Sequence, residues 1–215
     1  MNRSKNLFIN VQPFVVLCGL DGSGKTTVLN KLTKVYNEIL VTHWGDLNIR
    51  NDQNQKEWFQ IGDNPAKYVQ TLSPIQRSLY LSSMVWNSYE NLIQPALYKP
   101  NKFVISDSYF YKIWAKEKVY NLCDPIFYEL CLKLPRPQKI IFLDVKPEES
   151  YKRKTEISEY ETNGSSYKDY INFQSHVRYE ILNILSNINN NNIVFIDANG
   201  TLDSTYNNVL KTLDL

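Results

Sequence analysis

The sequence predicts an α/β fold in which helices flank a parallel β-sheet. Five short apolar runs, each too short for an independent helix, are spread along the 215 residues. Amphipathic helical patterns lie between these runs. Continuous apolar runs are typical of strands that are buried on both faces of a parallel sheet. Alternating strands and helices indicate right-handed crossovers within one layered fold.

The predicted strands are rich in Val, Ile, Leu and Phe, and in chain order they cover Pro13–Cys18, Ile39–Thr42, Phe103–Ser106, Lys139–Val145 and Asn192–Asp197. The helical patterns cover Thr26–Glu38, Pro74–Leu97, Asp169–Ile188 and Asp203–Leu213. The first helix is expected to place on one face Leu29, Leu32, Val35 and Tyr36. The long second helix is expected to turn toward the core Ile75, Leu79, Met84 and Trp86. Residues 48–68 are expected to be irregular with some helix.

Length and composition indicate a single globular domain covering residues 1–215, with a mobile insertion. The chain is 43% hydrophobic and 21% charged, with a net charge of +2, so global disorder is excluded and neither nucleic acid nor a membrane is expected as a partner. Cys18, Cys123 and Cys131 lack metal-binding spacing and are expected to be buried free thiols. Residues 1–10 resemble no secretory signal, which leaves a cytoplasmic location as the expectation.

A phosphate-binding P-loop follows the first predicted strand, in the segment Gly19-Leu20-Asp21-Gly22-Ser23-Gly24-Lys25-Thr26. Its glycines allow backbone N–H groups to curl around phosphate oxygens, and the next helix directs its N-terminal dipole at the same anion. Lys25 supplies a positive charge for the outer phosphates, and the Thr26 hydroxyl is a suitable Mg²⁺ ligand. A strand before the motif and a helix after it provide the context that the motif requires.

The same segment, extended to Thr27, resembles the P-loop of the thymidylate kinase family, in which an acidic residue precedes the second glycine. Further stretches resemble that family in the same order: Leu92–Leu97, Val104–Tyr109, Lys139–Pro147 with Glu148 and Arg153, and Phe195–Gly200. The resemblance implies a three-layer P-loop NTPase fold with five parallel strands, helices on both sides and a short lid, at about residues 150–168, that carries an arginine. It also implies transfer of the ATP γ-phosphate to a nucleoside monophosphate, with dTMP as the first candidate and Mg²⁺ as the cofactor.

The resemblance also implies roles for individual residues. Lys25, Asp107 and Arg153 are the expected catalytic residues, and Thr26 and Asp107 the expected metal ligands. ATP is expected to contact Gly19, Asp21, Gly22, Ser23, Gly24, Lys25, Thr26, Thr27 and Asn199. The acceptor is expected to contact Asp21, Trp44, Trp86 and Tyr109. Lys112 and Arg178 are secondary candidates for phosphate contacts.

Departures from the family pattern gather on the acceptor side. Where the family has Asp-Arg-Tyr, this chain has Asp107-Ser108-Tyr109. The arginine of the family's long helix that contacts the acceptor aligns near Val85, which carries no charge. Arg77 lies about two turns earlier and is not expected to replace it. Aromatic residues of the presumed acceptor region are expected mostly to pack in the core: Tyr80, Trp86, Tyr89, Tyr109, Phe110, Tyr111 and Trp114.

These departures leave two alternatives open. An uncharged acceptor, such as a nucleoside or a sugar, would not need the missing arginines. An ATP-binding regulatory protein would need no acceptor at all, although it would not need Lys25, Thr26 and Asp107 together. A homodimer formed through the long helices is a further expectation from the family.

Overall fold

The computed structural model describes residues 13–43, 65–122, 124–158, 161–162, 164, 166–188 and 192–215, with backbone alone for residues 65–67. Its centre is a five-stranded parallel sheet with the strand order β2-β3-β1-β4-β5. The strands are β1 (Phe14–Gly19), β2 (Ile39–Thr42), β3 (Phe103–Asp107), β4 (Lys139–Asp144) and β5 (Ile193–Asp197). Each predicted strand is confirmed, with its ends displaced by one residue at most.

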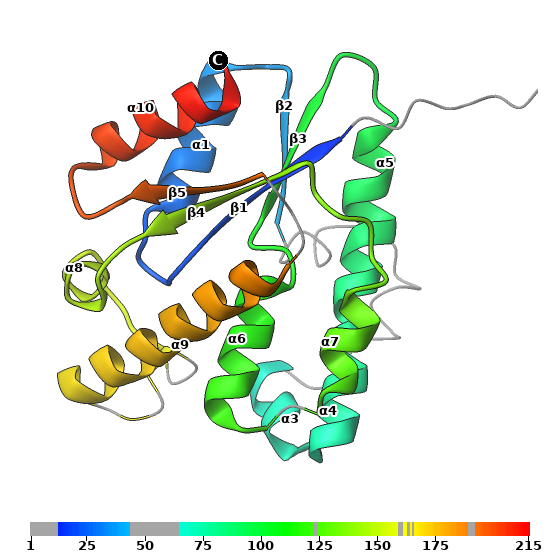
Figure 1. The fold of residues 1–215 in the computed structure, drawn as a ribbon, viewed down its shortest axis with the longest axis vertical. Helices are drawn as coiled ribbons and strands as arrows, with labels where there is room; N and C mark the ends of the chain where they lie inside the picture. The colour runs from blue at the N-terminus through cyan, green and yellow to red at the C-terminus, as the bar shows by residue number, and fades with distance from the viewer. Residues whose placement is uncertain are drawn as a thin grey trace, which may run out of the picture.

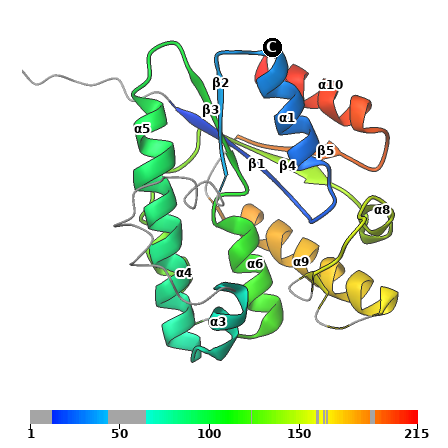
Figure 2. The ribbon, with the colours of Figure 1, turned by 180° about the vertical axis from the view of Figure 1, so that it is seen from behind.

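Helices cover both faces of this sheet and give the three-layer α/β arrangement expected from the sequence. In Figures 1 and 2, α1 (Lys25–Val35) and α10 (Leu202–Leu213) lie on one side of the sheet, with α6 (Tyr111–Tyr120) and α9 (Tyr167–Asn187) on the other. Helix α6 packs against both α9 and β1. The carboxyl ends of the central strands β1 and β3 therefore open toward the loops that precede α1 and α6.

A long helical column stands beside the sheet and runs through α4 (Pro74–Ser88), the π-helical segment η2 (Tyr89–Ile93) and α5 (Gln94–Leu97). Ser73 begins it with a capping box, because its hydroxyl accepts from the Gln76 backbone N–H while the Gln76 side chain accepts from the Ser73 N–H. The expectation that Ile75 and Leu79 face the core is wrong, since they are 43% and 47% exposed. The buried face of α4 instead carries Arg77, Ser78, Leu81, Ser82 and Val85.

Two other predictions of burial also need correction. Val35, at the end of α1, is 59% exposed, although Leu29 and Leu32 are buried as expected. Edge strand β5 is not buried on both faces, because Phe195 is 55% exposed. A strand at the edge of a sheet has a neighbour on one side only, so a continuous apolar run does not ensure burial there.

Three helices in the described ranges were not predicted from the sequence: α6, α7 (Ile126–Cys131) and α8 (Pro147–Lys152). Helix α3 (Pro65–Thr71) overlaps the end of residues 48–68, where some helix was expected. Helices α3, α7 and α8 are short, with 7, 6 and 6 residues. Helix α6 is longer, but its buried face includes Lys116 and Glu117, so its sequence lacks a continuous apolar stripe. Aromatic side chains at its start pack in the core as expected, among them Tyr109, Phe110, Tyr111 and Trp114.

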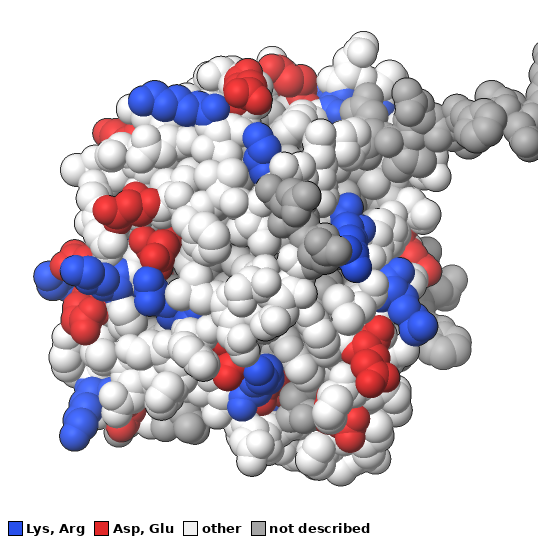
Figure 3. Space-filling view, viewed as in Figure 1, with Lys and Arg blue, Asp and Glu red and all other residues white. Residues whose placement is uncertain are grey.

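The surface and the cysteines agree with the composition. On the face seen in Figure 3, acidic and basic side chains are interspersed rather than gathered into a field of one sign. Among the described residues, Cys18 and Cys131 are buried thiols that form no disulfide, whereas Cys123 lies outside this part of the chain. Of the helices that the structure describes, none has the length and apolar character needed to cross a lipid bilayer.

Candidate active site

The P-loop connects the carboxyl end of β1 to the first turn of α1. Gly22 and Gly24 have φ angles of 72° and 89°, in the left-handed region that favours glycine. A Cβ atom on Gly22 would also lie 2.6 Å from the Ser150 carbonyl oxygen of α8. Both the backbone conformation and the close approach of α8 therefore require glycine at position 22.

Lys25 is the first residue of α1, and its ammonium group lies within the loop. Its Nζ donates hydrogen bonds to the carbonyl oxygens of Gly19 at 3.0 Å and Leu20 at 2.8 Å. The residue is 7% exposed. Burial and, next, the charge of Lys112 lower the pKa of Lys25 to about 8, whereas Asp107 and Asp21 oppose this shift. Lys25 is thus a desolvated cation for which an anionic partner is strongly favourable.

A cavity of about 360 Å³ opens over this loop. Seven consecutive P-loop residues, Asp21–Thr27, line it together with Lys112, Arg153, Lys154, Glu161 and Leu202. Four of the lining residues are basic, Lys25, Lys112, Arg153 and Lys154, and they share the cavity with the first residues of α1. Backbone N–H groups at a helix N-terminus and convergent cations form a site suited to a polyphosphate.

Asp21 lies between the loop and the opposite helix layer. Its carboxylate pairs with Lys112 through Oδ1 and with Lys116 through Oδ2 at 2.9 Å, and the Asp21 side chain is 11% exposed. Burial raises the pKa of Asp21, but Lys112 and Lys116 hold that pKa well below its ordinary value. The Ser150 hydroxyl donates to the Asp21 carbonyl oxygen, which joins α8 to the loop.

Asp107 ends β3, the strand beside β1. His43 Nδ1 lies 3.3 Å from Asp107 Oδ2, and the Ser108 hydroxyl donates to Oδ1 at 2.8 Å. Burial raises the pKa of Asp107, but these hydrogen bonds and the charge of Lys25 bring the pKa below its ordinary value. The two residues that follow, Ser108 and Tyr109, have positive φ angles of 66° and 47°. Such angles are uncommon outside glycine, so this strained turn fixes the carboxylate where β3 leads into α6.

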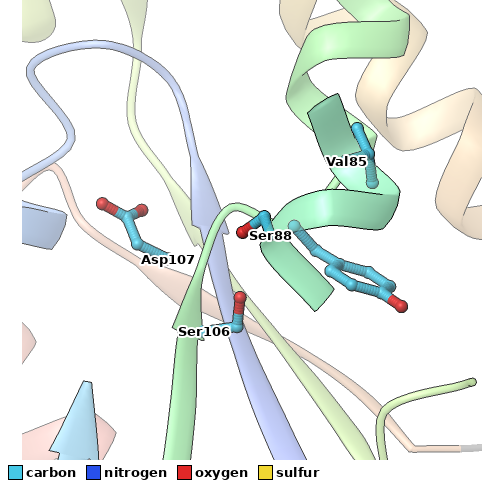
Figure 4. A pocket seen from close by; sticks show the side chains of 5 residues that line it. Val85, Ser88, Ser106 and Asp107 are labelled. Carbon is cyan, nitrogen blue, oxygen red and sulfur yellow. The ribbon is translucent and has the colours of Figure 1, made fainter. Parts of the chain in front are cut away.

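A second, much smaller cavity of about 10 Å³ lies beside Asp107. Figure 4 shows Ser106 of β3 near Ser88 of α4, Val85 further along that helix, and the Asp107 carboxylate directed away from it. Tyr109 also lines this cavity, and its hydroxyl donates to the Pro135 carbonyl oxygen at 3.0 Å. The lining residues include no lysine or arginine.

The remaining acceptor candidates are Trp86 and Trp44. The Trp86 indole N–H donates to the Leu130 carbonyl oxygen at 3.2 Å and so joins α4 to α7. Trp86 is not among the residues that line either cavity. Trp44 lies outside the described residues. Of the acceptor candidates, Asp21 thus lines the larger cavity and Tyr109 the smaller one.

Arg153 follows α8 and lies in the wall of the larger cavity. Its Nη2 donates to the Gly200 carbonyl oxygen at 2.8 Å, which connects the lid segment to the loop between β5 and α10. Its buried Nη1 has no hydrogen-bond partner among the described residues. The side chain therefore has one guanidinium nitrogen anchored and another available for an anion.

Other polar candidates are held away from the cavities. The Asn199 side chain accepts from the Lys146 backbone N–H at 2.8 Å and donates to Asp197 at 2.7 Å, so it shapes the loop after β5. Arg178 forms a bidentate pair with Asp144 at 2.6 and 2.7 Å. Arg77 is 1% exposed and pairs with Glu117. This position agrees with the expectation that Arg77 does not replace the missing arginine.

Some residues of the cavity wall were not anticipated from the sequence. Lys154 and Glu161, which pair at 2.7 Å, come from the expected lid, and Leu202 begins α10. The mixed charges between residues 152 and 161 indicated a polar segment but gave no means of separating Lys154 from its neighbours. Lys112 was a secondary candidate, and the structure places it in the wall.

The oxygen donors near the P-loop fit a hard divalent cation. Thr26, which carries a hydroxyl, lines the cavity, and Asp107 has a lowered pKa that keeps it ionised near neutral pH. Mg²⁺ prefers oxygen ligands and typically takes one or two from protein and the rest from phosphate and water. The described residues contain no cluster of three or more His, Cys, Asp or Glu side chains that could hold a metal alone. This donor set therefore suits a metal that arrives with a phosphate.

Comparisons with known proteins agree with this geometry. The family model described as "Thymidylate kinase" matches residues 17–209. Thymidylate kinase from Mycoplasmopsis agalactiae is 30% identical over 152 residues, 66% of this chain and 67% of that protein. Thymidylate kinase from Mycoplasma capricolum is 29% identical over 93% of each chain. The solved structure of thymidylate kinase from Candida albicans has the same fold, with a TM-score of 0.67 at 23% identity, covering 94% of this chain and 91% of that one.

Proposed function

The chain belongs to the thymidylate kinase family, which makes it an ATP-dependent phosphotransferase that acts on dTMP, and from this premise we propose that transfer takes place where the P-loop cavity meets Asp107. One observation supports this location above the others. Seven consecutive loop residues and four basic side chains line a single cavity at the carboxyl end of the central strand β1. Ligands of open α/β sheets bind at this edge, where strand order reverses.

The triphosphate of ATP binds along the P-loop in this proposal. The loop N–H groups and the N-terminus of α1 face its oxygens, while Lys25 exchanges part of its contact with Gly19 and Leu20 for phosphate. The proposed donor contacts are the loop residues Gly19, Asp21, Gly22, Ser23, Gly24, Lys25, Thr26 and Thr27. Asn199 acts at one remove, by shaping the loop after β5.

Thr26 and Asp107 hold Mg²⁺ together with the nucleotide. When bound, the metal neutralises charge on the phosphates as they react. The lowered pKa of Asp107 keeps that residue able to ligate near neutral pH. His43, beside Asp107, fixes the orientation of the carboxylate.

The acceptor phosphate approaches the γ-phosphate from the side of Asp107 and Tyr109. An acceptor oxygen forms a bond to the γ-phosphorus while the bond to the ADP oxygen breaks, so positioning and charge neutralisation are the main tasks of the protein. Lys25 and Arg153 meet these tasks, the latter through its unpartnered Nη1. Trp86 is left out of the acceptor site because its indole is used between α4 and α7.

We also propose that two copies pair through α4. This long helix lies at one side of the molecule, and Ile75 and Leu79, four residues apart, form an exposed apolar pair on it. Two such faces in contact would remove these side chains from water.

Turnover with a panel of nucleotides tests the proposed function. With ATP and Mg²⁺, we expect ADP to form fastest with dTMP, and Lys25→Ala to lower kcat by about 100-fold or more while circular dichroism stays unchanged. The matched control is Lys31→Ala on the same helix, whose ammonium pairs with exposed Asp203 instead of lining the cavity. No ADP above the ATP-only blank with any monophosphate would overturn the proposal. Turnover of thymidine with none of dTMP would instead favour an uncharged acceptor.

A further inference from the structure

Lys112 is a cavity lysine that belongs to neither the P-loop nor the lid. It is the second residue of α6, five residues after Asp107, and enters the cavity from the helix layer opposite α1. Its side chain is 18% exposed. A lysine so enclosed is costly unless its charge is compensated, so its position in the cavity wall calls for an explanation.

Asp21 supplies part of that compensation and orients the ammonium group. Lys112 Nζ donates to Asp21 Oδ1, while Lys116, one helical turn further along α6, takes Asp21 Oδ2 at 2.9 Å. An ammonium group has three N–H donors. Asp21 is the one hydrogen-bond acceptor for Lys112 within the described ranges, so two donors remain for an anion in the cavity.

The charge of Lys112 acts on residues of both cavities in the active site. It contributes to lowering the pKa of Lys25 and of Asp107, so it acts on the donor lysine and on the carboxylate beside the smaller cavity. Burial lowers the pKa of Lys112, but Asp21 overcomes this effect and raises the pKa above its ordinary value. Lys112 is therefore cationic across the neutral range.

The smaller cavity provides no such charge of its own. Its lining consists of Val85, Ser88, Ser106, Asp107 and Tyr109. A phosphoryl group that passes from the P-loop toward Asp107 leaves the contacts of Lys25 and needs a cation on the other side. Lys25 and Lys112 both line the donor cavity and lower the pKa of Asp107, and Lys112 is the one of the two that lies outside the P-loop, on α6.

We infer that Lys112 is a catalytic residue that contacts the phosphoryl group in transfer, with Asp21 as the residue that positions it. The inference rests on the proposed function, since it assigns a further residue to the same reaction. Lys112 keeps its proton throughout and stabilises the charge that develops as the bond to the ADP oxygen breaks and the bond to the acceptor forms. Asp21, in turn, has the role of aligning Lys112 in addition to any contact with substrate.

Lys112→Gln separates charge from structure, because glutamine keeps an N–H donor for Asp21 but carries no charge. We expect kcat with ATP and dTMP to fall about 100-fold, with the KM for each substrate within a few-fold of the wild-type value. Lys112→Arg, which restores the charge, should regain at least tenfold of this loss. The matched control is Lys116→Gln, which removes the other cation of Asp21 from the same helix but does not line the cavity, and its kcat should fall by less than tenfold.

A binding measurement decides the question even if turnover fails. By calorimetry, wild-type protein should bind MgATP more tightly than MgADP, and Lys112→Gln should lose most of this preference because its cation meets the terminal phosphate. Equal kcat for Lys112→Gln and wild type would overturn the inference while leaving the proposed function intact. Equal losses for Lys112→Gln and Lys116→Gln would also overturn it, because they would show a purely structural role for the Asp21 network. An unchanged preference for ATP over ADP would overturn it as well. Absence of turnover in wild type alone would count against the proposed function.

Discussion

Lys25 shows, at the scale of one residue, how the fold prepares a site for an anion. The ammonium group is buried and bonded to carbonyl oxygens, and a second cation, Lys112, repels its charge. Burial and this repulsion lower its pKa to about 8. A bound polyphosphate would compensate both effects and return the pKa toward its ordinary value. Part of the binding free energy therefore depends on the protonation of one side chain.

Nucleotide affinity should fall as the pH rises above about 8. Above this value free Lys25 is mostly neutral, so binding must take up a proton and weakens by up to tenfold per pH unit. Calorimetric titration with MgATP from pH 7 to 9.5, in two buffers of different ionisation enthalpy, measures both the affinity and the proton uptake. Constant affinity with no proton uptake at pH 9 would contradict the assigned environment of Lys25.

The lowered pKa of Lys25 also affects the free energy of unfolding, which should rise with pH where nucleotide affinity falls. The pKa of Lys25 is lower in the folded protein, about 8, than the ordinary value of 10.5, so the unfolded chain holds the extra proton between these values. The contribution of Lys25 to the free energy of unfolding should therefore rise from pH 8 to 10.5. Urea unfolding of wild type and Lys25→Met across this range should show a steeper rise for wild type. Parallel curves would count against the shift.

The predicted site residues lie together in the structure where a local motif fixes the backbone. Asp21–Thr27 are contiguous, so their common place in one cavity follows from the strand, loop and helix around them. Asn199 and Trp86 were inferred from resemblance and composition, and their side chains are used in contacts between segments far apart in sequence. Such contacts depend on tertiary packing that no local pattern contains.

Helix α6 shows, at the scale of an element, why apolar periodicity is an incomplete guide. It buries Lys116 and Glu117 beside apolar Trp114 and Ala115, because each charge has a partner on another element. Glu117 accepts from Arg77 of α4, with Nη2 at 2.7 Å, and Arg77 also donates to the Val69 carbonyl oxygen of α3 at 3.1 Å. An apolar pattern cannot mark a helix face that is buried through ion pairs.

Glu117→Gln should destabilise the protein by about 3–5 kcal/mol, because it leaves the buried Arg77 guanidinium without its counter-charge. The control is Glu180→Gln. Glu180 pairs with Lys118, which lies on the same helix as Glu117, and this pair is more exposed, so its loss should cost less than about 1 kcal/mol. Chemical denaturation gives both values. Similar losses for the two variants would show that the Arg77–Glu117 pair does not hold α4 to α6 as described.

At the scale of the whole molecule, the strands were the most predictable elements. Continuous apolar runs located the five strands of the described ranges, and the middle residues of the central strands are buried, as for Val16 and Phe142, each 0% exposed. The faces of α4 were less predictable. Ile75 and Leu79 look like core residues in sequence but lie on the outside, and buried Arg77 and Ser78 look like surface residues.

This reversal on α4 gives a prediction about assembly. Wild-type protein should sediment as a dimer, and Leu79→Glu should shift it to monomer by placing a charge in the apolar contact. Val35→Glu is the control, since Val35 is also exposed but ends α1 on the other side of the sheet. A wild-type monomer at all concentrations measured, or dissociation of both variants alike, would contradict pairing through α4.

The most direct test of the account follows the phosphate itself. Protein is mixed with Mg²⁺, dTMP and ATP labelled at the γ-phosphate, and the products are separated. The account predicts that the label appears in dTDP with wild-type protein and is nearly absent from dTDP with Lys25→Ala. Label that stays in ATP, or that is released only as inorganic phosphate, would contradict transfer at the P-loop.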